Sequence, residues 1–171
     1  MTYPTPRILT TALILFALCG TSTHASMARP HRTAATDFEF TGFSPTGGLR
    51  GAGHRYHLSD LRGKVVVLDF WASLCGPCER SLPEINRLSN RYSDVIFPGV
   101  NDENAAVIQR TRRDLGLRFP TAFDVDDSIS GLYGIRAMPT TVIIDRDGRV
   151  VETIEGLRLD GARAIAQAAR G

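Results

Sequence analysis

A β-branched apolar run opens the most regular stretch of the chain. Val65–Leu68 is followed by Asp69 and then by Phe70 and Trp71, and such a run predicts a strand that is covered on both faces. Further along, apolar side chains recur at the spacing of one helix face, at Leu82, Ile85, Leu88 and Tyr92. The pattern therefore predicts a central strand that passes into a helix, with Cys75 and Cys78 at the junction.

Shorter apolar segments, separated by Gly, Pro and Asp, predict the other elements. Strands are expected over 38–43, 54–58, 95–100 (with a bulge at Pro98), 140–145 and 149–155. A loop is expected over 44–53, and a short segment over 119–124 that leads to a turn. Helices are expected over 101–114, 129–133 and 161–170, the last capped by Asp160. Strands flanking a helix form a parallel pair with a right-handed crossover, and the closing hairpin adds antiparallel strands. The expected fold class is α/β, a mixed central sheet with helices on both faces.

Composition fits one ordinary domain. The chain has 171 residues, of which 43% are hydrophobic, enough for a sizeable core. Its formal net charge is +2, from 20 basic and 18 acidic residues that are interspersed along the sequence. Without a basic block or a basic amphipathic helix, neither a nucleic-acid partner nor a membrane-surface partner is expected.

The N-terminus has the order of a targeting segment. Arg7 precedes the apolar stretch Ile8–Leu18, and small residues follow, with cleavage expected after Ala25 or Ala28. We therefore expect a signal peptide over 1–25, a flexible leader over 26–36 and one domain over 37–171, in a periplasmic or otherwise extracytoplasmic protein. A retained membrane anchor is the alternative, although the apolar stretch is short for a spanning helix.

The cysteine pair carries the candidate chemistry. The free N–H groups of a helix start favour negative charge, so Cys75 should ionise more readily than a free thiol. A thiolate attacks disulfides, and Cys78 lies close enough in sequence to attack any mixed disulfide formed on Cys75. A structural disulfide or half of a zinc site are the alternatives. Zinc sites need about four ligands, and the sequence has no second C-x-x-C and no matching His pair, so no metal is expected.

The residues around the pair resemble the active site of the thioredoxin superfamily. Cys75-Gly76-Pro77-Cys78 is flanked as in that family by Trp71-Ala72, by Asp69 and by Pro83. The lead-in Leu58–Lys64 resembles that of exported, TlpA-like or ResA-like thiol-disulfide oxidoreductases. The resemblance implies a thioredoxin-like three-layer fold with an N-terminal β-hairpin, and a redox-active Cys75–Cys78 disulfide with no other cofactor.

A second segment resembles the cis-proline loop of the same family. Tyr133–Thr141 contains Met138-Pro139, and the resemblance implies a cis bond before Pro139 and a backbone edge that pairs with an extended substrate. Substrate contacts are expected from Trp71 as a wall of the site, and from Gly76, Pro77, Met138 and Pro139. Leu74 departs from the family, which usually has a second Trp at this position, and this puts substrate preference in doubt.

Asp69 is the third candidate for a catalytic role. Its strand is expected to be covered on both faces, and poor solvation favours the protonated carboxyl. A carboxyl group with a raised pKa can take the proton of Cys78 as that thiol becomes a nucleophile. The position matches the buried acid of thioredoxin, whereas many TlpA-like proteins have a neutral residue there. The alternative is an Asp that reaches water at the strand end.

These features together predict an exported reductase of protein disulfides. The expected partners are exported protein disulfides or thiols, for example in cytochrome c maturation, and a membrane electron carrier as reductant; the protein is expected to be a monomer. The rival hypothesis is a non-catalytic copper or apoprotein chaperone that uses Cys75 and Cys78 as ligands, although copper-delivering relatives usually have wider cysteine spacing and a partner His. A peroxidase is a weaker alternative, because peroxidatic sites do not need the second cysteine.

Overall fold

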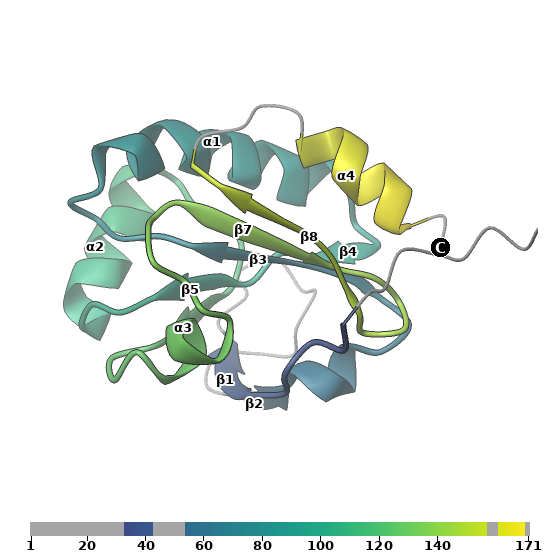
Figure 1. The fold of residues 1–171 in the computed structure, drawn as a ribbon. Helices are drawn as coiled ribbons and strands as arrows, with labels where there is room; N and C mark the ends of the chain where they lie inside the picture. The colour runs from purple at the N-terminus through teal and green to yellow at the C-terminus, as the bar shows by residue number, and fades with distance from the viewer. Residues whose placement is uncertain (1–32, 43–53, 157–160, 170–171) are drawn as a thin grey trace, which may run out of the picture.

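The computed structural model describes residues 33–42, 54–156 and 161–169. Its centre is a mixed sheet, with strands in the order β6-β5-β3-β7-β8 and β4 beside β3 (Figure 1). The strands are β3 Val65–Phe70, β4 Val95–Ile96, β5 Gly99–Asn101, β6 Thr121–Phe123, β7 Thr140–Ile144 and β8 Val150–Glu155. Strands β4 and β5 run parallel to β3, and β6 runs parallel to β5, whereas β7 and β8 complete the sheet in antiparallel pairing.

Helices and a small second sheet cover the two faces. One core layer joins β3 to α1 Gly76–Arg91, α2 Ala105–Asp114 and α4 Gly161–Ala168. The other joins it to α3 Ser128–Leu132, the 3₁₀ helix Leu58–Leu61 and the antiparallel strands β1 Glu39–Gly42 and β2 His54–His57. Figure 1 shows α1 and α4 on one side of the sheet and α3 with β1–β2 on the other. The α/β fold class expected from the sequence is confirmed, including its N-terminal antiparallel pair.

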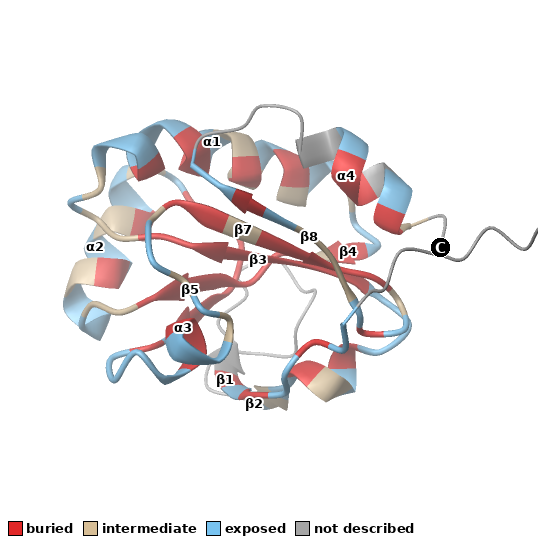
Figure 2. Cartoon of the chain, in the orientation of Figure 1, coloured by how far each residue is buried: buried red, intermediate tan, exposed pale blue. Residues whose placement is uncertain are grey.

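The central strand owes its position to the alternation of its side chains. Val65, Val67 and Trp71 pack in the layer of α1 and α4, while Val66 and Phe70 pack against the layer of α3 and β1. Every residue of β3 is buried, as the continuous red of this strand shows in Figure 2. An apolar run without polar alternation is what a strand covered on both faces requires.

Two predicted elements differ from the structure. The strand expected over 95–100 is split into β4 and β5, because Phe97 and Pro98 leave the ladder between them. Pro98 has no N–H to donate, yet its carbonyl oxygen accepts a 3.0 Å hydrogen bond from Asp69 N. The helix expected from Asn101 begins at Ala105 instead, because Asn104 caps it by accepting from the N–H groups of residues 106 and 107.

The end of the predicted flexible leader is held in place. The Thr33 carbonyl accepts from Val150 N, Ala34 forms a bridge with Arg149, and the Tyr133 hydroxyl donates to the Thr36 carbonyl. Residues 33–35 of the predicted leader thus pair through their main chain with the β7–β8 hairpin, and Thr36 contacts the Tyr133 side chain.

Several predictions fall outside the described residues. They concern the signal peptide, the first part of the leader, the loop over 44–53 and the Asp160 cap. Within the described ranges, none of the helices combines the length and the apolar character needed to cross a membrane.

Candidate active site

The first helix begins at the cysteine pair. Cys75 is the N-cap residue of α1, with Gly76 and Pro77 in the first turn. The backbone N–H of Cys78 points at Cys75 Sγ, with 3.2 Å between nitrogen and sulfur, and a disulfide joins the two cysteines. In the reduced protein this N–H and the helix dipole stabilise a thiolate on Cys75.

The two sulfurs differ in exposure. Cys78 is fully buried among the side chains beneath α1, whereas Cys75 is only partly buried. Gly76 and Pro77 are exposed beside it, and Leu74 is 95% exposed. An approaching disulfide can therefore reach Cys75 first, and Cys78 is left to attack from within.

The loop before β7 closes the other side of the pair. The Met138–Pro139 peptide bond is cis, and the Met138 carbonyl oxygen lies 3.4 Å from Cys75 Sγ. Thr140 Oγ1 donates to the Ala137 carbonyl, and Gly156 N donates to the Pro139 carbonyl. The cis bond expected at Pro139 is confirmed, and Met138 lies against the nucleophile.

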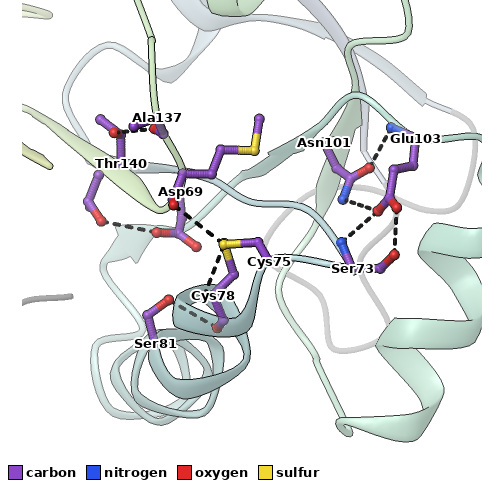
Figure 3. Close-up of a disulfide and its surroundings, with 11 residues drawn as sticks. Asp69, Ser73, Cys75, Cys78, Ser81, Asn101, Glu103, Ala137 and Thr140 are labelled. Carbon is purple, nitrogen blue, oxygen red and sulfur yellow. Dashed lines mark hydrogen bonds between the residues drawn. A yellow bond between two sulfur atoms is a disulfide. The ribbon is translucent and has the colours of Figure 1, made fainter. Parts of the chain in front are cut away.

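Asp69 lies on the face of the sheet that carries the disulfide. It shares this face with Val67 and with Trp71, which follows β3, and both of these side chains pack in the same cluster as Cys78. Figure 3 shows the Asp69 carboxyl group on the side of the cysteine pair. Asp69 is 1% exposed. Burial raises its pKa to about 7, against the opposing effect of a hydrogen bond from Thr141. The predicted burial of Asp69 is confirmed. The alternative, in which its carboxyl group reaches water at the end of the strand, is wrong.

A second carboxyl group at the site was not predicted. Glu103 accepts hydrogen bonds from Ser73 N, from Ser73 Oγ and from Asn101 Nδ2, and so ties the loop before Cys75 to the end of β5 (Figure 3). Burial acts to raise the pKa of Glu103, but the donors from Ser73 and Asn101 outweigh it, and the pKa is lowered.

The sequence held a signal for Glu103. It follows a strand that runs parallel to β3, and the carboxyl ends of parallel strands meet at one edge of a sheet, where ligand and reaction sites gather. The helix predicted over 101–114 contained Glu103, so the position of Glu103 just after a strand was not recognised.

A family model described as the AhpC/TSA family matches residues 32–153. The chain belongs to this family. Two curated relatives are both named thiol-disulfide oxidoreductase ResA. That of Bacillus thuringiensis (strain Al Hakam) is 39% identical over 107 residues, which are 61% of this chain and 62% of the relative. That of B. thuringiensis subsp. konkukian (strain 97-27) is 31% identical over 154 residues, 88% of each chain.

Among solved structures, a Chlorobium tepidum protein assigned as the thiol:disulfide interchange protein DsbE superposes with a TM-score of 0.67. It is 34% identical, and the match covers 80% of this chain and 93% of that one. The resemblance to thioredoxin-like and ResA-like proteins is thus confirmed, and so is the thioredoxin-like fold. The alignment with the B. thuringiensis Al Hakam relative nevertheless spans 62% of that protein, which is less than two thirds of its length.

In this AhpC/TSA-family member, Trp71 has a different place from the one expected. Its ring is fully buried, and Nε1 has no hydrogen-bond partner. Gly99 makes room for it, because a Cβ at this position would lie 2.7 Å from Nε1 and 2.8 Å from the Phe119 ring. A fully buried ring offers no surface to a substrate, so the predicted contact is corrected to a packing role beneath the site.

The other predicted substrate contacts lie around Cys75. Gly76 and Pro77 are exposed, Met138 is partly buried, and Pro139 is buried. In the part of the chain that the structure describes, no three His, Cys, Asp or Glu side chains gather as metal ligands. The arrangement brings together a partly exposed cysteine, Cys75, a buried cysteine, Cys78, and a buried acid, Asp69. These groups can carry out thiol-disulfide exchange.

Proposed function

We propose that this protein is a thiol-disulfide oxidoreductase that reduces disulfides of exported proteins. The observation that carries the proposal is the cysteine pair itself: a partly exposed Cys75 at a helix start, bonded to a fully buried Cys78. The names of the ResA relatives and of the DsbE neighbour support the same activity.

The reaction follows from the exposure of the two sulfurs. The Cys75 thiolate attacks one sulfur of a substrate disulfide, a mixed disulfide forms, and the other substrate sulfur leaves as a thiolate. Cys78 then loses its proton to Asp69 and attacks Cys75 Sγ. The second substrate sulfur leaves, and the Cys75–Cys78 disulfide remains. The substrate has gained two electrons, and the protein has lost two.

Direction and location are parts of the proposal. The Gly-Pro pair between the cysteines and the acid at Asp69 resemble reducing members of the superfamily, which favours reduction over oxidation. Export is supported by Arg7, the apolar stretch Ile8–Leu18 and the small residues after it. In an oxidising compartment the spent disulfide needs a reductant, and we assign this to a membrane electron carrier. A disulfide of apocytochrome c, whose reduction frees the two cysteine thiols, is among the candidate substrates.

The disulfide serves as the redox centre without a further cofactor, and the protein acts as a monomer. The mature chain begins at Ser26 or Arg29, followed by a leader and one thioredoxin-like domain. N-terminal sequencing of the protein from the soluble fraction tests the processing, and light scattering tests the monomer. An intact N-terminus in the membrane pellet would favour a retained anchor instead.

Insulin reduction tests the activity. The reduced parent should precipitate insulin chains catalytically with dithiothreitol as electron donor, while Cys75→Ser should be inactive. Cys78→Ser, expressed in cells, should accumulate mixed disulfides with its substrates, which mass spectrometry identifies. Stoichiometric Cu(I) binding by the parent without insulin reduction would favour the chaperone hypothesis, and peroxide consumption by Cys78→Ser would favour a peroxidase.

A further inference from the structure

Thr141 connects the buried acid to the cis-proline loop. It lies directly opposite Asp69 in the antiparallel β3–β7 ladder, two residues after Pro139. Its Oγ1 donates to Asp69 Oδ1 over 3.0 Å. Because the strand pairing fixes both backbones, the position of this hydroxyl is set by the same loop that places Met138 against Cys75.

The two oxygens of the Asp69 carboxyl group are therefore not equivalent. Oδ1 is held by Thr141, whereas Oδ2 is buried and has no hydrogen-bond partner. A buried carboxyl oxygen without a donor is costly when charged and is well suited to bind a proton. Of the two oxygens, Oδ2 has no donor and is therefore the better suited to receive the proton of Cys78.

Thr141 also borders a cavity on the same face of the sheet. The cavity has a volume of about 30 Å³, and Val67, Ser81, Glu84 and Pro139 line it with Thr141. A single water needs roughly 10–15 Å³ and two or more polar partners, so this space can hold one. Thr141 therefore contacts Asp69 and also lines a cavity with room for one water.

Few ionisable groups face Asp69 on this side. Helix α1 presents Cys78, and it presents Glu84 at the cavity, where the Glu84 carboxylate is paired with Arg87. Strand β8 and helix α4 present the apolar side chains of Ile154 and Ile165. The hydrogen bond from Thr141 is thus the main polar influence on the Asp69 carboxyl group.

We propose that Thr141 is a positioning residue for proton exchange between Asp69 and Cys78: its hydroxyl holds Oδ1, so that Oδ2 takes the Cys78 proton. The inference rests on the proposed function. In the resolving step the proton moves from Cys78 Sγ to Asp69 Oδ2, and the sulfur electron pair attacks Cys75 Sγ. The substrate thiolate leaves, and the protein disulfide forms.

Three substitutions separate positioning from simple space filling. Thr141→Val keeps the shape and removes the hydroxyl, whereas Thr141→Ser restores the hydroxyl without the methyl group. Thr153→Val on β8 is the matched control, because Thr153 is exposed. A role in packing alone predicts that Val replaces Thr without consequence and that Ser, which leaves a methyl-sized gap, is the harmful change.

The first measurement does not depend on activity. Asp69 is titrated by carboxyl carbon NMR in the oxidised protein, with the Cys75–Cys78 disulfide intact. Because Thr141 stabilises the charged carboxylate, its loss should raise the titration midpoint by about one pH unit. Thr141→Ser and Thr153→Val should stay close to the parent. An unchanged midpoint in Thr141→Val would overturn the inference, whatever substrate the protein has.

The second measurement uses the resolving step. The release of a model substrate thiol from the preformed mixed disulfide is followed against pH. In Thr141→Val the acid limb of this profile should move to higher pH by the same amount as the NMR midpoint. Thr141→Ser should return the limb to the parent position. In an Asp69→Asn background the Val substitution should have no further effect.

An acid limb that stays in place while the NMR midpoint moves would show that Thr141 holds Asp69 but does not control the proton transfer. If no variant, the parent included, resolves any mixed disulfide, the proposed function fails, and the NMR midpoint alone decides whether Thr141 holds the acid.

Discussion

Two carboxyl groups flank the cysteine pair in opposite surroundings. Asp69 lies beneath the disulfide with one donor, the hydroxyl of Thr141, and burial raises its pKa to about 7. Glu103 lies beside the loop before Cys75 with donors from Ser73 N, Ser73 Oγ and Asn101 Nδ2, and its pKa is lowered. Burial acts in the same direction on both groups, but Asp69 is fully buried with one donor, whereas Glu103 is only partly buried with three. Burial therefore prevails at Asp69, and the donors prevail at Glu103.

The difference separates two tasks that a carboxyl group can perform in one site. A group that is close to half-protonated near neutral pH can exchange a proton with a thiol, whereas a group that stays charged cannot. A charged group with three donors instead fixes the chain that supplies them. We therefore expect Asp69 to act on the chemistry of Cys78, and Glu103 to act on the placement of Ser73 and, through it, of Cys75.

The largest expected effect comes from removing the thiol that Asp69 serves. Cys78→Ser should lower insulin reduction by roughly a thousandfold or more, because the mixed disulfide on Cys75 has no resolving nucleophile. In this background the formation of the mixed disulfide should be insensitive to Asp69→Asn but slowed by Glu103→Ala, as stopped-flow measurements can show. Slowing by Asp69→Asn at this stage would mean that the acid acts on Cys75, and the separation of tasks would fail.

With both cysteines present, the two acids should differ in the resolving step. Asp69→Asn should slow resolution by roughly a hundredfold, the typical contribution of a positioned base. Glu103→Gln should change the rate by only a few-fold, because it alters the placement of the loop but leaves the proton acceptor intact. Resolution is measured from a preformed mixed disulfide at pH 8, with Glu155→Gln, an exposed position on β8, as control. Equal losses in the Asp69 and Glu103 variants would contradict the comparison.

Stability should depend on pH in opposite ways for the two acids. The folded-state pKa of Asp69, about 7, lies above the unfolded value of about 3.9. As pH rises from about 4 to about 7, the unfolded chain loses this proton before the folded one does, and stability falls. Asp69→Asn should therefore gain on the parent through this window, by roughly 2–4 kcal/mol at most. For Glu103 the folded pKa is the lower one, so its stabilising effect is present above the unfolded value and is lost in acid.

Urea denaturation between pH 3 and pH 8 tests both signs. Glu103→Ala should lose about 1–3 kcal/mol near neutral pH, the cost of leaving its donors unpaired, and should approach the parent as the pH falls below the folded pKa of Glu103. Parallel curves for Asp69→Asn and the parent would show that the folded and unfolded pKa values of Asp69 are equal. Glu155→Ala serves as the control for loss of an exposed carboxylate.

The sequence predicted one of these acids and not the other for a physical reason. Asp69 interrupts an apolar run, and a charge in a strand covered on both faces is visible in the one-dimensional pattern. Glu103 acquires its role from Ser73, thirty residues away, and from the end of β5. That contact depends on where the strand stops, and element boundaries are the least certain part of a pattern.

The same distinction applies to Trp71, Pro139 and Thr141. The cis bond at Pro139 followed from a motif carried by neighbouring residues. The burial of Trp71 depends on the space left by Gly99 on another strand, and the role of Thr141 depends on the β3–β7 register. Local motifs predicted the cysteine pair and the loop, whereas features that need two strands in a known register required the structure.

The smallest expected effect is at Leu74, which lies between Ser73, the residue bound by Glu103, and the nucleophile Cys75. Its side chain is 95% exposed, so Leu74→Trp adds apolar surface without disturbing the core. Unfolding free energy should stay within about 0.5 kcal/mol of the parent. A flat ring beside Cys75 should lower KM for apolar cysteine-containing peptides a few-fold, since extra apolar contact of this size contributes about 1 kcal/mol. The acid limb of the pH profile should not move, because the substitution alters neither Asp69 nor Thr141. Leu74→Ala should shift KM in the opposite direction, and a displaced acid limb in either variant would show that the surface beside Cys75 and the proton transfer beneath it are coupled.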